Sequence, residues 1–369
     1  MLKKAIIKAY YSDSMRSGVK WFFRRMPVNR IPYPQFIEVE VTTMPCPIRC
    51  RICENPYFSN EVRRQMSFDE FKLILDQFPK LKWLGATGIG EAWTNPDYPK
   101  MLRYAKKEKK VFIEMYDNFY FLDRDRIKSL IKNVDKLWIS IDGCTKKTYE
   151  KIRINSNFKK VVNNLQAFFE MKKKYKTDKP KIDFHFIINK INLNEVPDFV
   201  DFVASFNIPG DFLILFTKIL HPFKEVADIY VNKIPPNIIK ETEKRAKKHG
   251  IWVQWAGDIP TTEAKHAWTK SKELMDIKHC MAWVEPYFCS TGHVFPCCAQ
   301  NEFGKRKWQI ERCMGNIFET KNFKKIWFGP RYTQLKRMIR ANLTSPYCVG
   351  CPVYKTSSVS KVANKFLPK

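Results

Sequence analysis

The sequence predicts an α/β fold in which a parallel sheet curves toward a barrel and a smaller second domain follows. Three observations indicate this fold. Short β-rich runs alternate with helical periodicity from residue 36 to about residue 216, the pattern of consecutive βα units and a parallel sheet. The chain has 369 residues, enough for one large domain and a smaller one. After about residue 276 the sequence changes to short apolar runs, loops and cysteines.

Six β-rich runs and five helical segments make up the predicted βα units. Ser67 and Glu70 form a capping box, and Phe71, Ile74 and Leu75 share one face of the helix that follows. The functional face of such a sheet lies at the C-terminal ends of its strands. The predicted strands span about 36–43, 83–87, 111–116, 136–141, 182–188 and 211–216, and the other helices about 97–107, 123–133, 157–174 and 194–206.

We divide the chain into four parts. An N-terminal extension interleaves basic and aromatic residues at 20–25, and we expect its aromatics to pack on the main domain. The alternative is that it lies on a membrane surface or an acidic partner. Helices are also predicted at 236–248 and near 321–328 and 331–341, with a strand at 251–255. The four parts are the extension (1–35), the barrel core (36–225), a bridging segment (226–275) and a metal-bearing domain (276–369).

Composition excludes several classes of protein. A hydrophobic content of 44% with 14% aromatics excludes a mainly disordered chain. No run approaches the roughly 18 apolar residues of a transmembrane helix, and the N-terminus lacks the pattern of a secretory signal, so we expect a cytoplasmic protein. The net charge of +29 comes from lysines on nearly every predicted helix, which indicates a solvated surface. The alternative is an anionic partner such as nucleic acid, a phosphorylated metabolite or an acidic peptide.

The cysteines point to a metal centre. There are eleven, and clustered cysteines in a reducing compartment favour metal binding or catalysis over disulfides. Cys46, Cys50 and Cys53 form a C-x3-C-x2-C array directly after the apolar run 36–41. Structural zinc takes four ligands, and each of the four irons of a cubane cluster takes an outer ligand. Three cysteines therefore suggest a cluster with one open iron, the alternative being a zinc loop that a distant ligand completes.

A strand followed by this array in a βα-repeat domain resembles the radical S-adenosylmethionine superfamily. The resemblance covers roughly residues 36–355 and implies a partial (β/α)6, TIM-like barrel. It implies that Cys46, Cys50 and Cys53 bind a [4Fe–4S] cluster whose fourth iron is chelated by S-adenosylmethionine. One departure is Ile52, because the residue before the third cysteine is often aromatic in the family.

Further segments resemble the family's ligand-binding motifs in the expected order. Gly88, Gly90 and Glu91 follow the second predicted strand and resemble the glycine-rich motif that meets the methionine amino group. Glycines let the backbone approach a ligand, and a carboxylate accepts hydrogen bonds from an amino group. After the third strand, Asn118 matches the family's asparagine. Phe119 stands where the family often has glycine, and we expect it to alter the pocket.

The fourth strand supplies two more candidates. By the resemblance, Ser140 and Arg153 would contact the carboxylate or the ribose of S-adenosylmethionine; the alternative is a strand-end serine and a surface arginine. Asp183, Glu225 and Asp258 are candidates for a substrate base and cannot be ranked, so no catalytic side chain is assigned. The six histidines show no metal or triad spacing.

The C-terminal cysteines form a second constellation. Cys280 is followed by eleven residues, Gly292, four residues and Cys297, and the pair Cys348 and Cys351 comes later. This spacing resembles the auxiliary-cluster domains of the superfamily, called SPASM in the full form and twitch in the short form. By this resemblance we infer one auxiliary [4Fe–4S] cluster bound by Cys280, Cys297, Cys348 and Cys351. A four-cysteine zinc ribbon is the alternative.

Two departures favour the shorter form of this domain. The full form has further cysteines at the positions that here hold Ser357 and Lys361. Cys289, Cys298 and Cys313 remain. Any of the three could replace a ligand, and together they leave a second auxiliary cluster open.

The resemblance implies a radical enzyme. A low-potential donor of the flavodoxin or ferredoxin type would reduce the first cluster, and S-adenosylmethionine would be cleaved to a 5′-deoxyadenosyl radical that abstracts a substrate hydrogen. The auxiliary cluster would then assist a net oxidation or a crosslink. The substrate would be a peptide or protein side chain or a small molecule. The alternative from another class is a non-catalytic iron–sulfur or zinc protein that binds nucleic acid, with a strongly salt-dependent affinity.

Overall fold

The computed structural model describes most of the chain between residues 31 and 355. The described residues are 26–27, 31–58, 62–86, 88–219, 223–255, 275–298, 304, 306–349, 351 and 354–355. The basic and aromatic segment at 20–25 and the candidate base Asp258 lie outside these ranges. The expected packing of the N-terminal extension therefore stays a prediction.

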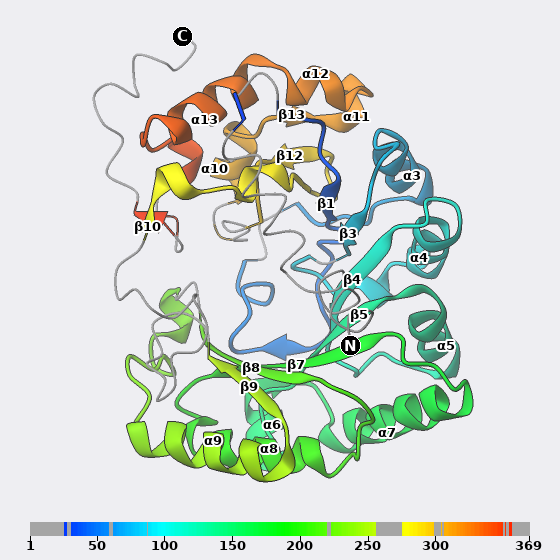
Figure 1. The fold of residues 1–369 in the computed structure, drawn as a ribbon, viewed down its shortest axis with the longest axis vertical. Coiled ribbons are helices and arrows are strands. Elements are labelled where there is room, and N and C mark those ends of the chain that lie inside the picture. The colour runs from blue at the N-terminus through cyan, green and yellow to red at the C-terminus, as the bar shows by residue number, and fades with distance from the viewer. Residues whose placement is uncertain are drawn as a thin grey trace.

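The described residues form one ten-stranded sheet whose central part is parallel. Its strand order is β13-β12-β11-β1-β3-β4-β5-β7-β8-β9. Figure 1 shows the sheet curving around the interior of the molecule, with helices on its outer side. Each of the six predicted β-rich runs overlaps one parallel strand, to within two residues at the strand ends where the strand extends past the run, which confirms the predicted fold class. These strands are β1 (Phe36–Val39), β3 (Trp83–Gly85), β4 (Phe112–Asp117), β5 (Lys136–Ser140), β7 (Lys181–Ile188) and β8 (Leu213–Lys218).

The alternation of side chains along the strands gives the sheet an apolar outer face and a more polar inner face. In β7, Phe184 and Phe186 are fully buried on the helix side. The Phe186 ring lies 4.7 Å from the ring of Phe199, between centroids, on a covering helix. Asp183 and His185 alternate with these phenylalanines and therefore face the interior of the curved sheet.

Six helices cover the outer face at the places the sequence predicts (Figure 1). The first begins with the predicted capping box, in which the Ser67 side chain and the Glu70 side chain each accept from the other's backbone N–H. Its residues Phe71, Ile74 and Leu75 are buried, as the periodicity predicts. The helices are α3 (Phe68–Asp76), α4 (Tyr98–Lys107), α5 (Arg124–Asn133), α7 (Phe158–Lys174), α8 (Val196–Ala204) and α9 (Pro236–His249).

One helix and one small sheet do not follow from the sequence patterns. Helix α6 (Lys146–Ile152) begins at its N-cap Thr145. Directly after it, β6 (Arg153–Ile154) pairs antiparallel with β2 (Arg49–Cys50). Strands of two residues are too short to show a period of two, so only the folded chain reveals this pairing.

The cysteine-rich C-terminal part extends the same sheet. Strand β11 pairs in parallel with β1, β12 pairs antiparallel with β11, and β13 pairs antiparallel with β12. The sheet is thus continuous between the predicted barrel core and the predicted metal-bearing domain. The position of the boundary between them stays a prediction. The remaining elements are β9 (Trp252–Trp255), β10 (Met275–Asp276), β11 (Tyr287–Phe288), β12 (His293–Phe295), β13 (Gly315–Asn316), β14 (Tyr354–Lys355), α10 (Arg306–Glu311), α11 (Ile317–Thr320), α12 (Phe323–Trp327) and α13 (Pro330–Arg340).

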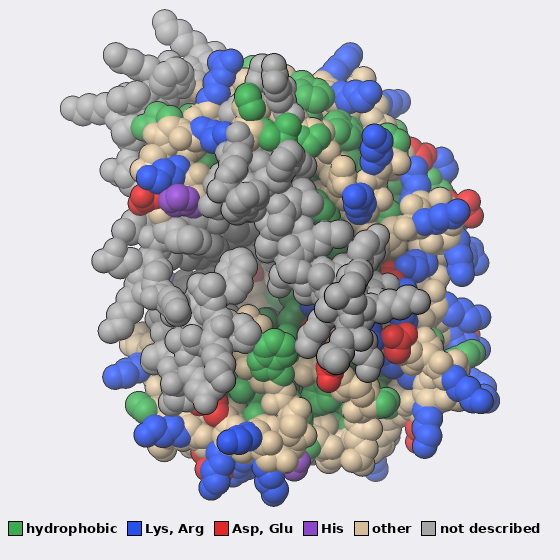
Figure 2. Space-filling model, viewed as in Figure 1, with side chains coloured by type: hydrophobic (Ala, Val, Ile, Leu, Met, Phe, Trp, Pro, Cys, Tyr) green, Lys and Arg blue, Asp and Glu red, His purple; other side chains and the backbone are tan. Residues whose placement is uncertain are grey.

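The basic side chains are spread over the described surface, as expected for a net charge that serves to solvate the protein. On the face seen in Figure 2, Lys and Arg side chains lie around the whole periphery of the described surface and do not gather in one patch. No helix in the described part of the chain combines the length and the apolar character that crossing a membrane requires.

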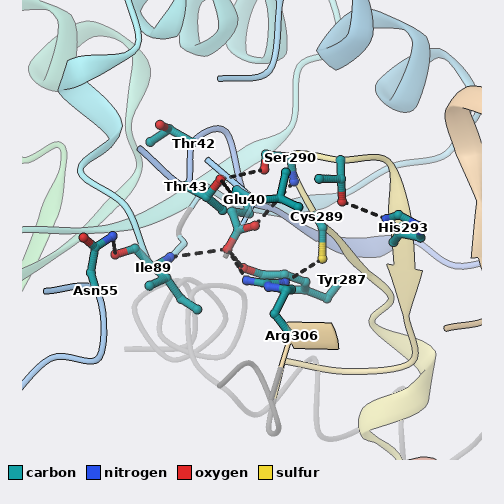
Figure 3. Close-up of polar contacts among 12 residues, drawn as sticks. Glu40, Thr42, Thr43, Asn55, Ile89, Tyr287, Cys289, Ser290, His293 and Arg306 are labelled. Carbon is teal, nitrogen blue, oxygen red and sulfur yellow. Dashed lines mark hydrogen bonds and ion pairs between the residues drawn. The ribbon is translucent and has the colours of Figure 1, made fainter. Parts of the chain in front are cut away.

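A buried ion pair joins the two halves of the sheet (Figure 3). Glu40, just after β1, is fully buried, and its Oε2 accepts from the Arg306 guanidinium at 2.9 Å and from the Tyr287 hydroxyl at 3.0 Å. The backbone N–H of Ser290 donates to Oε1 at 3.4 Å, and that of Ile89 donates to Oε2 at 3.5 Å. One carboxylate therefore links β1, the glycine-rich segment and the C-terminal part.

We predict that breaking this ion pair strongly destabilises the fold. Arg306→Met should lower the free energy of unfolding by about 3–5 kcal/mol, because it leaves the Glu40 carboxylate buried without its cation. The double variant Glu40→Gln, Arg306→Met should lose less, because no buried charge remains. Denaturant unfolding measures both. As a control, Arg245→Met removes a surface cation that lies 2.5 Å from Asp198 and should cost about 0–1 kcal/mol. Equal losses for the two arginines would contradict the prediction.

Candidate metal and cofactor site

The first cysteine loop lies at the C-terminal edge of the sheet, where it is held from two sides. It follows β1, and its short strand β2 pairs with β6 so that Cys50 lies opposite Arg153. The backbone N–H of Arg51 donates to the Ile152 carbonyl at 2.8 Å, and that of Cys53 donates to the Cys50 carbonyl at 3.2 Å. The loop is therefore fixed to the segment that follows β5.

Asn55 ties the cysteine loop to the glycine-rich segment. Its side chain is 2% exposed. The Oδ1 atom accepts from the Cys46 backbone N–H at 3.1 Å, and Nδ2 donates to the carbonyls of Met44 and Ile89, each at 3.4 Å. Figure 3 shows the contact with Ile89. Sequence reasoning missed this asparagine; the only signal is its place two residues after the last cysteine of the array.

The glycines of the next segment pack against the chain that leaves β1. A Cβ atom on Gly88 would come within 2.7 Å of Cγ of Glu40, and one on Gly90 within 2.5 Å of the Thr42 carbonyl oxygen. Any side chain at either position would clash with its neighbour. The glycines therefore let this segment lie directly beside the cysteine loop, and Glu91 follows at its end.

Glu91 forms a buried carboxylate pair with Asp117. Burial, followed by the charge of Asp117, raises the pKa of Glu91 to about 7, and burial raises the pKa of Asp117 to about 6. Trp93 donates to both carboxylates, from its backbone N–H to Glu91 at 3.1 Å and from its indole Nε1 to Asp117 at 2.5 Å. The side-chain amide of Asn118 also donates to Glu91. Such a pair favours a cation or a further donor beside Glu91.

The expectation that Phe119 alters the pocket is wrong. Its backbone adopts a left-handed conformation with φ 61°, which glycine favours. Its ring is fully buried and meets the ring of Phe168 edge-on, at 5.3 Å between centroids. The side chain therefore lies in the core between sheet and helices.

Arg153 is a buried residue in an ion pair, so the alternative of a surface arginine is wrong. Its NH2 and Nε lie 2.7 and 2.8 Å from Oδ2 of Asp142, which is fully buried. The other oxygen of Asp142 accepts from the Ile187 backbone N–H at 2.9 Å. This places a positive charge beside Cys50, and that charge lowers the pKa of the thiol against the larger effect of burial.

The first loop has the chemistry of a metal centre. Burial raises the pKa of Cys46 to about 12 and raises the pKa of Cys50 and Cys53, and neighbouring thiols raise those of Cys46 and Cys50 further. Soft thiolates suit zinc and iron–sulfur clusters and lose their protons when they coordinate a metal. Among the described residues no three His, Cys, Asp or Glu side chains converge as ligands of a single ion do. A cubane takes one outer ligand on each of four irons, commonly a cysteine thiolate, so the residue types of this loop suit three of those positions.

The inner face of the sheet beside this loop is polar. Ser140 ends β5 and lies next to His185 of β7 in the register of the sheet. Nε2 of His185 lies 2.9 Å from the Thr217 hydroxyl on β8. Burial lowers the pKa of His185 to about 4, so the imidazole is neutral at pH 7. Sequence reasoning missed both His185 and Thr217, although the phenylalanines that alternate with His185 signal its inward direction.

The four predicted C-terminal cysteines act on one another electrostatically. Burial, followed by the charges of Cys297, Cys280 and Cys351, raises the pKa of Cys348 well above its usual value. The Cys351 backbone N–H donates to the Cys348 carbonyl at 3.2 Å. The four residues come from distant points of the chain, and their thiols are of the kind that suits an iron–sulfur cluster; that they hold one stays a prediction.

The remaining C-terminal cysteines lie close by. Cys289 and Cys313 share one apolar cluster with Tyr347, and Cys297 packs against it. The Arg306 guanidinium donates to the Cys289 sulfur at 2.8 Å. Cys298 hydrogen-bonds to the carboxylate of a glutamate on β1. Whether any of them binds a cluster stays a prediction.

Two of the candidate bases, Asp183 and Glu225, lie in the described part of the chain. Asp183 lies 3.2 Å from the Lys136 ammonium and accepts from the Leu213 backbone N–H at 2.9 Å. Glu225 is exposed in a short 3₁₀ turn. Neither arrangement leads to an assignment.

Two family models match the chain in the order of its two cysteine groups. The model of the radical SAM superfamily matches residues 41–203, which contain the first cysteine loop, Glu91 and Arg153. The model of an iron–sulfur cluster-binding domain, SPASM, matches residues 280–352, which contain the second group. Together the two matches cover more than half of the chain.

One curated relative and two solved structures are similar over most of their length. The relative is a "tungsten-containing aldehyde ferredoxin oxidoreductase cofactor-modifying protein" of Pyrococcus furiosus, 24% identical over 86% of this chain and 87% of its own. SuiB of Streptococcus suis, solved with S-adenosylmethionine, matches 98% of this chain and 88% of its own at 16% identity and a TM-score of 0.63. The enzyme anSMEcpe, solved with AdoMet and the Kp18Cys peptide, matches 88% of this chain and 91% of its own at 15% identity and a TM-score of 0.57. At these identities the two structures show the fold alone.

Proposed function

The chain belongs to the radical S-adenosylmethionine superfamily, and on that premise we propose that it cleaves S-adenosylmethionine reductively to oxidise or crosslink a substrate. Its two domains imply a [4Fe–4S] cluster, S-adenosylmethionine and auxiliary iron–sulfur chemistry as cofactors. One observation carries the proposal. The three-cysteine loop, the Glu91 carboxylate and the Arg153 guanidinium meet at one edge of the sheet, where the electrostatic effects of Glu91 and Arg153 reach Cys46.

We assign the first site to residues of three segments. Cys46, Cys50 and Cys53 hold the cluster, and Glu91 and Asn118 bind the amino group of S-adenosylmethionine. When bound, the cluster supplies the electron that cleaves S-adenosylmethionine to the 5′-deoxyadenosyl radical. Gly88 and Gly90 keep the segment beside the loop by their close packing.

Two further residues complete the first site. Ser140, at the end of β5 on the inner face, contacts the carboxylate or the ribose of S-adenosylmethionine. Arg153 contributes its positive charge from behind Cys50, because two of its nitrogens already bind Asp142. That charge favours the anionic state of a thiolate-ligated centre.

We assign the second site to Cys280, Cys297, Cys348 and Cys351, which hold one auxiliary [4Fe–4S] cluster. This cluster would take one electron from the substrate radical that remains after hydrogen abstraction, and a flavodoxin- or ferredoxin-type donor would reduce the first cluster. The continuous sheet between β1 and β11 supports this arrangement, because it fixes the two cysteine groups relative to each other.

We propose a peptide or protein side chain as the substrate. The anSMEcpe structure, which shares this fold over 88% of the chain, was solved with a peptide. A specific observation favours a second candidate, a small molecule: the Pyrococcus furiosus relative covers nearly all of this chain, and its name describes it as cofactor-modifying.

The first prediction here tests the cluster and its cysteines. Anaerobic reconstitution should give about eight irons for two cubanes, and reduction with S-adenosylmethionine should yield 5′-deoxyadenosine. The triple variant Cys46→Ala, Cys50→Ala, Cys53→Ala should keep about four irons and make none. Zinc in place of iron, or 5′-deoxyadenosine from the triple variant, would overturn the assignment. Cys144→Ala is the control, since that thiol is near Glu195, away from both groups.

The second prediction separates the two substrate classes. An extract of cells grown in heavy water is divided into a peptide fraction and a small-molecule fraction, and each is incubated with the reduced enzyme. The 5′-deoxyadenosine formed should acquire deuterium from the peptide fraction, because the radical takes its hydrogen from the substrate. Mass spectrometry detects the label. Deuterium from the small-molecule fraction alone would decide for the second candidate.

The third prediction concerns Glu91. In the absence of S-adenosylmethionine, the raised pKa of Glu91 means that the folded protein binds more protons than the unfolded chain between about pH 4.5 and about pH 7. Stability should therefore fall as the pH rises through this window. Glu91→Gln should remove that loss and stabilise the protein at pH 8 by on the order of 2 kcal/mol, while S-adenosylmethionine binds more weakly. Thermal unfolding and equilibrium dialysis measure the two effects. A variant that is less stable at pH 8 would contradict this account.

A further inference from the structure

Buried polar atoms without a hydrogen-bond partner gather in one part of the molecule. Within the described residues, most such side-chain atoms lie between residues 309 and 347. They include the hydroxyl oxygens of Tyr332 and Tyr347, whose side chains are 0% and 2% exposed. A buried polar group that lacks its hydrogen bond costs about 1–3 kcal/mol. Such a pair in one place calls for a bound group that accepts from it.

Both tyrosines lie among the C-terminal cysteines. Tyr347 precedes Cys348 in the chain and packs in the apolar cluster that holds Cys289 and Cys313, with Cys297 against it. Tyr332, on α13, packs in the main core, and Cys297 lies close enough to act on it electrostatically. A phenol has an ordinary pKa of about 10, so both hydroxyls are protonated at pH 7 and act as donors.

The rest of their surroundings offers no other use for the two hydroxyls. The nearest rings are apolar walls: Trp327 lies 4.8 Å from Tyr332, and Phe295 and Trp308 each lie 5.9 Å from Tyr347, between centroids. A phenylalanine would fill the same space without a buried donor. An acceptor would satisfy both hydroxyls, and among the described neighbours the cysteines would supply sulfur in that role.

The side-chain amide of Gln309, on α10, is also buried without a hydrogen-bond partner among the described residues. Gln309 is fully buried, and neither its amide oxygen nor its amide nitrogen has a partner. It lies one turn after Arg306, which already donates to the Cys289 sulfur. Donors therefore approach the cysteines from α10, from α13 and from the segment before Cys348.

We propose that Tyr332 and Tyr347 donate O–H hydrogen bonds to sulfur atoms of the auxiliary iron–sulfur centre and raise its reduction potential. This inference rests on the proposed ligands Cys280, Cys297, Cys348 and Cys351. A reduced cluster carries one more negative charge, and donors to its sulfurs stabilise that state more than the oxidised one. The two hydrogen bonds would therefore make the auxiliary centre, rather than the first cluster, the better electron acceptor. The tyrosines act through the cluster and touch no substrate.

The test uses the full chain with the first cluster removed, so that only the auxiliary centre is observed. In the parent Cys46→Ala, Cys50→Ala, Cys53→Ala, the change Tyr332→Phe, Tyr347→Phe should leave the iron content at the parent's value and lower the midpoint potential. We expect a shift in the reduction equilibrium of about tenfold, which is about 59 mV for a one-electron couple. Each single variant should shift it in the same direction by less. A redox titration followed by electron paramagnetic resonance measures the potential.

A matched control and three outcomes decide the matter. Tyr98→Phe removes an equally buried hydroxyl that donates to the Ala86 carbonyl at 3.4 Å in the barrel half, and it should leave the potential unchanged. A midpoint that stays at the parent's value, with full iron, overturns the role of the tyrosines and leaves the ligands intact. A parent that binds no iron overturns the ligand assignment and the inference with it. If the double variant fails to fold, the same shift in both single variants supports the proposal, and its absence overturns it.

Discussion

The arrangement of both cysteine groups depends on the buried ion pair between Glu40 and Arg306. Glu40 follows the strand that leads into the first loop, lies against Gly88 of the glycine-rich segment, and binds Arg306 of the C-terminal part. A fully buried ion pair needs such partners, because neither charge is solvated by water. Strand β11 beside β1 gives the carboxylate a further side-chain donor, Tyr287. The barrel and the auxiliary domain are therefore held in one register.

Several interior polar groups of this protein lie where a bound cofactor would complete their interactions. Glu91 lies beside a second buried carboxylate, and burial raises the pKa of Cys46 and its neighbours. Tyr332 and Tyr347 carry buried hydroxyls without a protein acceptor. A protein interior tolerates such groups where a ligand, a metal or a sulfur completes them. The buried carboxylate, thiols and hydroxyls would each be completed in the same way: by the amino group of a ligand, by the irons of a cluster and by the sulfurs around those irons.

Sequence reasoning succeeded where a local pattern is sufficient and failed where a single distant contact decides. The six parallel strands and their helices follow from periodicity, as the alternation of Phe184 and Phe186 with inward residues shows. Asn55 and Thr217 carry no such pattern, since each matters through one hydrogen bond to a distant segment. The identity of Phe119 predicted an altered ligand pocket, but its backbone adopts a left-handed conformation and its ring packs against Phe168 in the core.

The sequence by itself determined the fold class, the spacing of the cysteines and the family, because periodicity and ligand spacing are local properties of the chain. Only the tertiary structure decided what surrounds those cysteines. Arg153 binds Asp142 behind Cys50, and Arg306 reaches across the sheet to Glu40. Long-range packing sets the burial and the electrostatic surroundings of each group, and these control its charge state, its donors and its acceptors. The residue types of the site therefore follow from the sequence, and their electrostatic surroundings follow from the folded structure.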